Sequence, residues 1–312
     1  MKINELLNVK YPLIQGGMAN IATGEFAASV SNAGALGLIG AGGMTTEILK
    51  ENIQKCKELT SQPFGVNLMM LNPYVDEMAQ LVIDEGIKVV TTGAGNPSKY
   101  MKAWKEAGII VMPVVPSVAL AKRLERSGAD AVIVEGTEAG GHIGELTTMA
   151  LVPQVVEAVS IPVIAAGGIA SGKQLLAAYA LGASGVQVGT CLLASEECPV
   201  HENYKNAIVK AKDTDTTVTG RIGGTPVRII KNRMAKEYIK REKEGASMEE
   251  LETYTLGSLR KAVLEGDIQS GSLMAGQVAG LVKEIKPVKA IIEDLFHDCE
   301  AEKEKLINFL GE

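Results

Sequence analysis

Two glycine-containing segments, Gly167-Gly168 and Gly189-Thr190, follow short apolar runs in the second half of the chain. Backbone amides that carry no side chain can approach phosphate oxygens closely. Gly167-Gly168 also precedes a predicted helix, whose amino end presents free N–H groups and a favourable dipole. Together the two segments favour a phosphate-binding site over a pair of tight turns.

Two amide side chains, Asn67 and Gln187, stand at the ends of predicted strands. An amide both donates and accepts hydrogen bonds, so each could pair with the edge of a flavin ring, which presents both kinds of group. Each could equally be a satisfied polar group in the protein interior. Because both amides occur together with the predicted phosphate-binding loops, a role in ligand binding is favoured.

His142 is the candidate catalytic residue. It follows Gly140-Gly141 in a predicted loop, which indicates a mobile, exposed imidazole that can exchange a proton near neutral pH. The other two histidines, His201 and His297, lie in charged helical stretches and are expected at the surface.

Eight short β-branched runs must position these residues. The intervals between them resemble amphipathic helices at 72–85, 117–127 and 171–181, the last with Ser171 as its expected cap. Strands that alternate with helices predict a parallel sheet, and eight such units before residue 200 favour a closed (β/α)₈ TIM barrel over a doubly wound open sheet. The runs are 12–15, 36–39, 64–67, 88–91, 109–112, 131–134, 162–165 and 185–188.

The active site of such a barrel lies in the loops that follow the strands. These loops include 15–19 after the first strand, and Glu135 with 139–142 after the sixth. The segment 40–43 after the second strand resembles half of a dinucleotide-binding fingerprint. Its third glycine is wrongly spaced and no acid ends a strand about 20 residues later, so we predict no Rossmann domain.

The pattern changes after Thr190. Residues 201–271 are rich in charge and lack strand periodicity, with helices expected at 231–244 and 248–265. We interpret this stretch as a mainly helical subdomain, inserted after the eighth strand, that covers the substrate. The barrel then comprises 1–200 and 272–312, with a final helix at 287–310.

Composition narrows the class of protein. The net charge of -6 over 312 residues gives no general attraction to nucleic acids or anionic membranes. The absence of a signal-like start and of a long apolar run predicts a cytoplasmic protein. No Cys-x-x-Cys pair occurs, so neither a metal site nor a disulfide framework is expected, and Cys191 beside Leu192 is interpreted as a buried small residue.

At these residues the sequence resembles the flavin-dependent type II enoyl-[acyl-carrier-protein] reductases of bacteria, within the nitronate monooxygenase (2-nitropropane dioxygenase-like) superfamily. The similarity covers nearly the whole chain. Stretches 89–97 and 113–119 favour the reductase branch, because an aromatic and histidine-containing segment typical of the nitronate enzymes is missing. The motifs that carry the resemblance are 15–19, 64–67, 138–144, 165–169, 186–190 and 274–277.

The resemblance implies reduction of trans-2-enoyl thioesters by NADH in fatty acid biosynthesis, with FMN as cofactor. It also implies a homodimer, and it allows for a monovalent cation that orders a loop. His142 would stand over the flavin and either polarise the thioester or relay a proton. The resemblance implies these cofactor-binding residues: Gly17, Met18, Ala19, Asn67, Glu135, Gly140, Gly141, Ala166, Gly167, Gly168, Gln187, Val188, Gly189, Thr190, Met274, Gly276 and Gln277.

Three alternatives stay open at this stage. A nitronate monooxygenase would use FMN with O₂ and a histidine base. A lyase or isomerase barrel would use the glycine loops for a substrate phosphate, and a flavin-binding protein could be inert.

Residues 221–243 carry a local excess of positive charge. Because acyl carrier protein is acidic, this stretch could steer it to the active site, or it could be an ordinary solvated helix face. Only Glu237 and Glu242 oppose the basic residues, which are Arg221, Arg228, Lys231, Arg233, Lys236, Lys240, Arg241 and Lys243.

Overall fold

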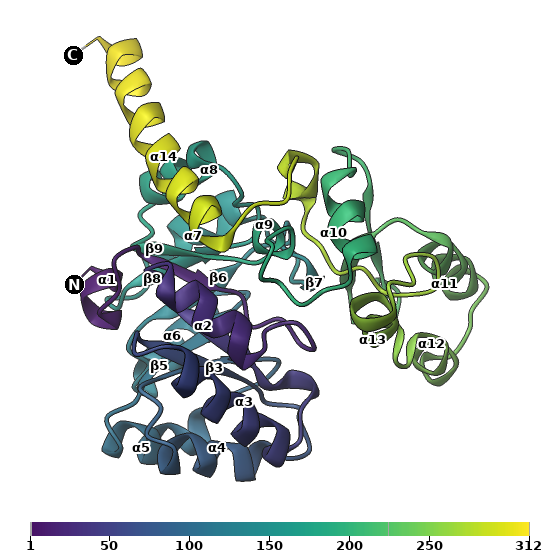
Figure 1. The fold of residues 1–312 in the computed structure, drawn as a ribbon, viewed down its shortest axis with the longest axis horizontal. Coiled ribbons are helices and arrows are strands. Elements are labelled where there is room, and N and C mark those ends of the chain that lie inside the picture. Colours follow the sequence, from purple (N-terminus) through teal and green to yellow (C-terminus); the bar gives the residue numbers. More distant parts are fainter. Residues whose placement is uncertain (1, 224, 312) are drawn as a thin grey trace.

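Eight parallel strands form one sheet in the computed structural model, which describes residues 2–223 and 225–311 (Figure 1). The strand order is β1-β9-β8-β6-β5-β4-β3-β2, and a parallel bridge between Ile14 and Leu36 joins the two ends. The predicted TIM barrel is therefore confirmed. The strands are β1 (Leu13–Gln15), β2 (Gly37–Gly40), β3 (Phe64–Met69), β4 (Val89–Gly93), β5 (Ile110–Val115), β6 (Val132–Glu135), β8 (Val163–Ala166) and β9 (Gly185–Val188).

Helices surround this sheet, and one of them extends past it. The helix α14 runs along α8 and then projects beyond the barrel (Figure 1). No helix within the described residues is both long enough and apolar enough to cross a bilayer. The helices of the barrel are α1 (Ile3–Leu7), α2 (Gly24–Asn32), α3 (Thr46–Leu59), α4 (Val75–Asp84), α5 (Ser98–Glu106), α6 (Val118–Arg126), α7 (Thr148–Val156), α8 (Gly172–Ala180) and α14 (Val288–Leu310), with 3₁₀ turns at Ala41–Gly43 and Gln277–Leu281.

Ser171 occupies the predicted N-cap position of α8, but its side chain does not make the capping hydrogen bond. Its hydroxyl donates to Gln174 Oε1 at 3.1 Å rather than accepting from a helix amide. Gln174 instead accepts a hydrogen bond from the amide of Ala170 at 2.9 Å. Gln174, in the first turn of α8, therefore folds back onto the residues that precede the helix.

Each strand is buried on both faces, which explains the continuous apolar runs of the sequence. Ile14, Leu38 and Ile133 belong to a core that fills the barrel, while their neighbours pack outward against the helices. Because successive side chains of a strand alternate between faces, Glu135 lies on the same inner side as Ile133. Polar residues at the carboxyl ends of the strands are thus directed to the barrel mouth.

The stretch expected to be mainly helical also contains strands. Four-residue strands β10 (Thr216–Thr219) and β11 (Val227–Ile230) pair antiparallel, and β11 pairs in turn with β7 (Gly141–His142). Neither strand is long enough to show a clear period of two, which explains why the sequence analysis predicted no strand there. The other elements are α9 (Thr190–Leu193), α10 (Glu202–Val209), α11 (Arg233–Lys243), α12 (Met248–Thr255), α13 (Ser258–Arg260) and a π-helical turn at Lys261–Glu265.

The helix expected over 248–265 is interrupted. Leu256 has an extended ψ of 123°, and Gly257 takes a left-handed φ of 72°, so α12 ends before α13 begins. The inserted stretch has a small core of its own that includes Met234, Tyr238 and Leu251. The β7–β11 pairing nevertheless joins the insert to a barrel loop, and the division at residues 200 and 272 stays a prediction.

Candidate functional site

A cavity of about 350 Å³ opens at the carboxyl ends of the barrel strands. It brings together every predicted site residue except Gln277, whose backbone amide donates to Glu138 O at 2.9 Å and whose side chain is exposed. The predicted residues that line the cavity are Gly17, Met18, Ala19, Asn67, Glu135, Gly140, Gly141, His142, Ala166, Gly167, Gly168, Gln187, Val188, Gly189, Thr190, Met274 and Gly276.

Several lining residues were not among the predicted site residues, although four of them (Gly16, Glu138, Ala139 and Ile169) lie in motifs that the sequence analysis names. Gly42 belongs to the segment set aside as half a dinucleotide fingerprint, and Glu138 lies in the loop after β6. The rule that every loop after a strand contributes to the site would have found most of them. The remaining residues are mainly apolar: Gly16, Ile21, Met69, Gly93, Ala94, Val114, Ala139, Ile169, Leu193, Leu259 and Val278.

The glycine loop after β8 requires glycine for its conformation. Gly167 and Gly168 have φ values of 85° and 79°, in the left-handed region that side chains disfavour. A β-carbon on Gly167 would also lie 2.9 Å from the carbonyl oxygen of Gly136. The loop can therefore present backbone to the cavity only while both residues lack side chains.

The two predicted amides are placed differently. Asn67 donates through Nδ2 to Thr91 Oγ1 at 2.8 Å, so its side chain is oriented by the neighbouring strand. Gln187 is buried, and its Oε1 has no hydrogen-bond partner within residues 2–223 and 225–311. A buried acceptor without a partner is costly, so the cavity suits a ligand that brings a donor to Gln187.

Glu135 and His142 both have shifted pKa values. Burial at the end of β6 raises the pKa of Glu135 to about 7. The imidazole of His142 is exposed, yet surrounding protein displaces enough water to lower its pKa below the ordinary value. Both shifts favour the neutral forms, so at neutral pH the cavity can hold an uncharged imidazole and a carboxyl group that exchanges its proton.

His142 is exposed, as predicted, but it lies in a short strand rather than in a loop. His142 lies opposite Val227 in the β7–β11 pair, and the following amide, that of Ile143, donates to Pro226 O at 3.1 Å. The strand partner comes from 85 positions later in the chain, so local sequence could not reveal it. The imidazole is thus presented from a strand shared by the barrel and the insert.

A network of polar contacts holds the loop that carries His142. Glu138 Oε2 accepts from Thr148 N at 2.7 Å, and the Thr148 hydroxyl lies 2.9 Å from Gly167 O. Thr190, predicted to bind a cofactor, uses its hydroxyl to accept from Gly276 N at 2.9 Å. The Thr190 side chain therefore anchors the returning segment, residues 274–277, which leads from the insert back to the barrel, while Thr190 itself still lines the cavity.

Residues expected to lie outside the site do so. His201 and His297 are exposed, and His201 Nδ1 accepts from Asn203 N at 3.1 Å at the start of α10. Cys191 is buried, which raises its pKa to about 12 and leaves it a poor nucleophile at neutral pH. The expectations for these residues are confirmed.

The sequence is similar over nearly its full length to proteins of one family. The nitronate monooxygenase family model matches residues 1–82 and 72–298. A probable nitronate monooxygenase of Staphylococcus saprophyticus is 36% identical, over 94% of this chain and 96% of the relative. A (3aS,4S,5R,7aS)-5-hydroxy-7a-methyl-1-oxo-octahydro-1H-indene-4-carboxyl-CoA dehydrogenase of Rhodococcus jostii is 31% identical, over 95% of each chain.

Solved structures similar to this chain include FabK and a nitroalkane oxidase. FabK from Thermotoga maritima is 48% identical over 98% of each chain, with a TM-score of 0.96. The nitroalkane oxidase from Streptomyces ansochromogenes is 27% identical over 97% of this chain and 99% of the neighbour, with a TM-score of 0.86. The chain is thus more similar to FabK than to this oxidase in both sequence and shape.

Proposed function

The chain belongs to the nitronate monooxygenase family of oxidoreductases, and from this premise we propose that it is an FMN-dependent enoyl-[acyl-carrier-protein] reductase that uses NADH. The observation that carries the proposal is the likeness to FabK, an enoyl-acyl-carrier-protein reductase, at 48% identity and a TM-score of 0.96. The residues of the cavity are compatible with both this reaction and the binding of a flavin.

The cavity offers suitable groups for each part of FMN. Backbone amides of Gly167, Gly168 and Gly189 would hold the phosphate, since no side chain blocks their approach. The partnerless Oε1 of Gln187 would accept from the ring edge, and Glu135 would bind a polar group of the cofactor. When bound, FMN supplies the hydride relay between NADH and the enoyl carbon.

The protein groups around that cofactor would manage the substrate's charge and position. A neutral His142 can donate a hydrogen bond to the thioester carbonyl or deliver a proton to the α-carbon. Apolar side chains of the same cavity, such as Met69, Leu193 and Val278, would contact the acyl chain and exclude water. The β7–β11 pairing would keep the imidazole over the reacting carbon atoms.

Nitronate oxidation is the second candidate. Relatives that cover nearly the whole chain are named probable nitronate monooxygenases, and His142 could serve as the base that such a reaction needs. That reaction would consume O₂ and a nitroalkane and would not depend on NADH.

One assay separates the two. NADH oxidation by the purified yellow protein would be followed with and without a trans-2-enoyl thioester, in the presence and absence of a monovalent cation. Oxygen uptake with a nitroalkane would be measured in parallel. We expect NADH oxidation that depends on the thioester. Oxygen uptake with the nitroalkane in the absence of NADH would instead favour the monooxygenase function over the reductase function.

A further inference from the structure

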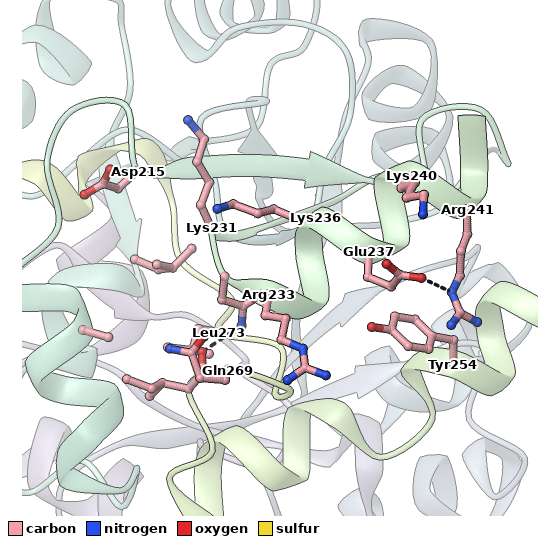
Figure 2. Close-up of a pocket in the computed structure, with 14 residues that line it drawn as sticks. Asp215, Lys231, Arg233, Lys236, Glu237, Lys240, Arg241, Tyr254, Gln269 and Leu273 are labelled. Carbon is pink, nitrogen blue, oxygen red and sulfur yellow. Dashed lines mark hydrogen bonds and ion pairs between the residues drawn. The ribbon is translucent and has the colours of Figure 1, made fainter. Parts of the chain in front are cut away.

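A second hollow, of about 1080 Å³, lies on the insert and shares no lining residue with the barrel cavity (Figure 2). The end of β11, one face of α11 and Tyr254 of α12 line it, together with Ile268, Gln269 and Leu273. We call it the basic groove. The cations that line it are Lys231, Arg233, Lys236, Lys240 and Arg241, and the acids are Asp215 and Glu237.

The acids of the basic groove are already engaged. Glu237 Oε1 lies 2.9 Å from Arg241 Nε, and the Arg241 guanidinium lies 4.3 Å from the centre of the Tyr254 ring (Figure 2). Asp215 accepts from the backbone amide of Lys212 at 2.9 Å. The groove therefore keeps an excess of positive charge that its own acids do not cancel.

Lys231, Arg233 and Lys236 carry the free charge of the groove, and of these three Lys231 is held by a hydrogen bond to the carbonyl oxygen of Thr214. Of the five cations, only Lys240 and Arg241 form ion pairs within the described residues, at 4.0 Å with Glu244 and 2.9 Å with Glu237. The whole chain has a net charge of -6, so the groove departs from the sign of the molecule. Such a local field attracts an acidic partner and orients it.

Not all basic residues of the stretch 221–243 lie in the basic groove. Arg221 lies 3.8 Å from Glu145, and Arg228 is buried with its Nε donating to Thr137 O at 3.1 Å. Neither of these two residues lines the groove, and Lys243 does not line it either. Only the five groove cations can therefore act together on one partner.

Apolar side chains also line the basic groove. Ile230, Ile268 and Leu273 line it together with the charged residues. A hollow lined by both apolar side chains and cations matches the amphipathic helix of an acidic protein, which presents apolar anchors between carboxylates. A solvated helix face without a partner would need no apolar lining.

The groove and the barrel cavity lie on either side of one segment. Leu273 lines the groove and the next residue, Met274, lines the cavity. Met274 is held from both sides, by a bridge to Ile229 and by a hydrogen bond from Tyr204 Oη to its carbonyl oxygen at 2.8 Å. A protein seated in the groove would thus hold a tethered thioester next to the cavity.

We propose that the basic groove docks an acidic helix of the carrier protein that delivers the enoyl thioester, with Arg233 and Lys236 as its main contacts. This inference rests on the proposed function. Arg241 contributes less, because Glu237 and Tyr254 already hold it. Docking then affects the encounter with carrier-bound substrate and leaves the chemistry in the cavity unchanged.

The test uses a double charge reversal, Arg233→Glu with Lys236→Glu, in the FMN-loaded full chain. Its matched control is Arg123→Glu with Lys50→Glu, which reverses one arginine and one lysine exposed on α6 and α3. We expect the groove variant to lose about tenfold or more in kcat/KM on carrier-bound thioester, through KM. Activity on a short free thioester should stay within about twofold, and the control should match the parent on both.

A binding measurement separates this inference from the proposed function. Fluorescence anisotropy with a labelled acyl carrier protein that bears no acyl group reports docking whether or not the enzyme reduces thioesters. We expect salt-dependent binding that the groove variant loses and the control keeps. Equal binding by parent and groove variant, or equal losses on both thioesters, would overturn the docking site, while absent turnover with intact docking would overturn only the reductase.

Discussion

At the scale of single residues, burial sets the protonation of the two titratable groups of the cavity. Desolvation raises the pKa of Glu135 and lowers that of His142, so both resist charging. Opposite shifts of an acid and a base in one cavity are a frequent feature of catalytic sites. The consequences of each shift can be measured separately.

Replacement of His142 by alanine should lower turnover by about 100-fold or more, since positioned acid–base groups contribute that much. FMN should remain bound, because the groups proposed to hold the phosphate and the ring lie in other loops. Steady-state NADH oxidation and the flavin absorbance of the purified variant would be compared with the parent. Unchanged turnover would remove His142 from the mechanism.

Replacement of Glu135 by glutamine should stabilise the apoprotein at pH 8 but hardly at pH 5. The ordinary pKa of 4.5 applies to the unfolded chain, while the folded value is about 7, so the unfolded state loses its proton first as the pH rises. The parent therefore loses stability between pH 4.5 and 7, by roughly 3 kcal/mol if the full shift applies. Urea titrations at both pH values measure the difference, and an equal effect at pH 5 and pH 8 would contradict the explanation.

At the scale of elements, loops that follow strands carry the site, and contacts between loops hold them in place. The segment with His142 contacts the β8 loop through Thr148, and the returning segment through Glu138. The backbone of the β8 loop depends on glycine at two consecutive positions. Substitution in such a loop should act on ligand binding as well as stability.

Gly167→Ala should abolish most FMN binding and cost about 1–3 kcal/mol of stability, because its φ of 85° and its contact with Gly136 O both oppose a β-carbon. Gly86→Ala is the matched control, since Gly86 has a φ of 65° with open space around it. The control should lose about 1 kcal/mol and keep its flavin. Flavin content after purification and urea midpoints test both, and FMN loss in the control alone would refute the assignment.

At the scale of the whole molecule, one closed barrel and its insert form two hollows whose linings meet at the 273–274 segment. The barrel supplies the cavity, and the insert supplies the basic groove together with the strand that fixes His142. The far end of α14 leaves Phe309 and Leu310 exposed beyond the barrel (Figure 1). The homodimer implied by the resemblance stays a prediction.

Removal of FMN should destabilise the entire barrel, because the cavity is lined by loops that follow strands from all around the barrel. Free FMN at about 1,000 times its Kd should raise the free energy of unfolding by roughly 4 kcal/mol. Thermal unfolding of the apoprotein across a titration with FMN measures this effect. A Tm that does not respond to FMN would argue against a flavin site in the cavity.

Local patterns in the sequence determined the barrel and most of the cavity. Apolar runs bounded by glycine predict strands that are buried on both faces, and the fold then places the strand ends at one mouth. All eight strands and the shared location of Asn67, Glu135 and Gln187 could be read in this way. Each strand follows from a short local pattern, and the meeting of the three side chains follows from the rule that all strands of a barrel end at one mouth.

Only the tertiary structure decided which distant segments meet. The β10–β11 hairpin was missed because four-residue strands carry too little periodicity, and the strand that holds His142 depends on a partner far along the chain. Gln277 belongs to a predicted motif but its side chain lies outside the cavity, and Arg221 and Arg228 lie outside the basic groove. Pairings between remote residues are set by packing and hydrogen bonding in three dimensions, which the spacing of residues along the chain does not record.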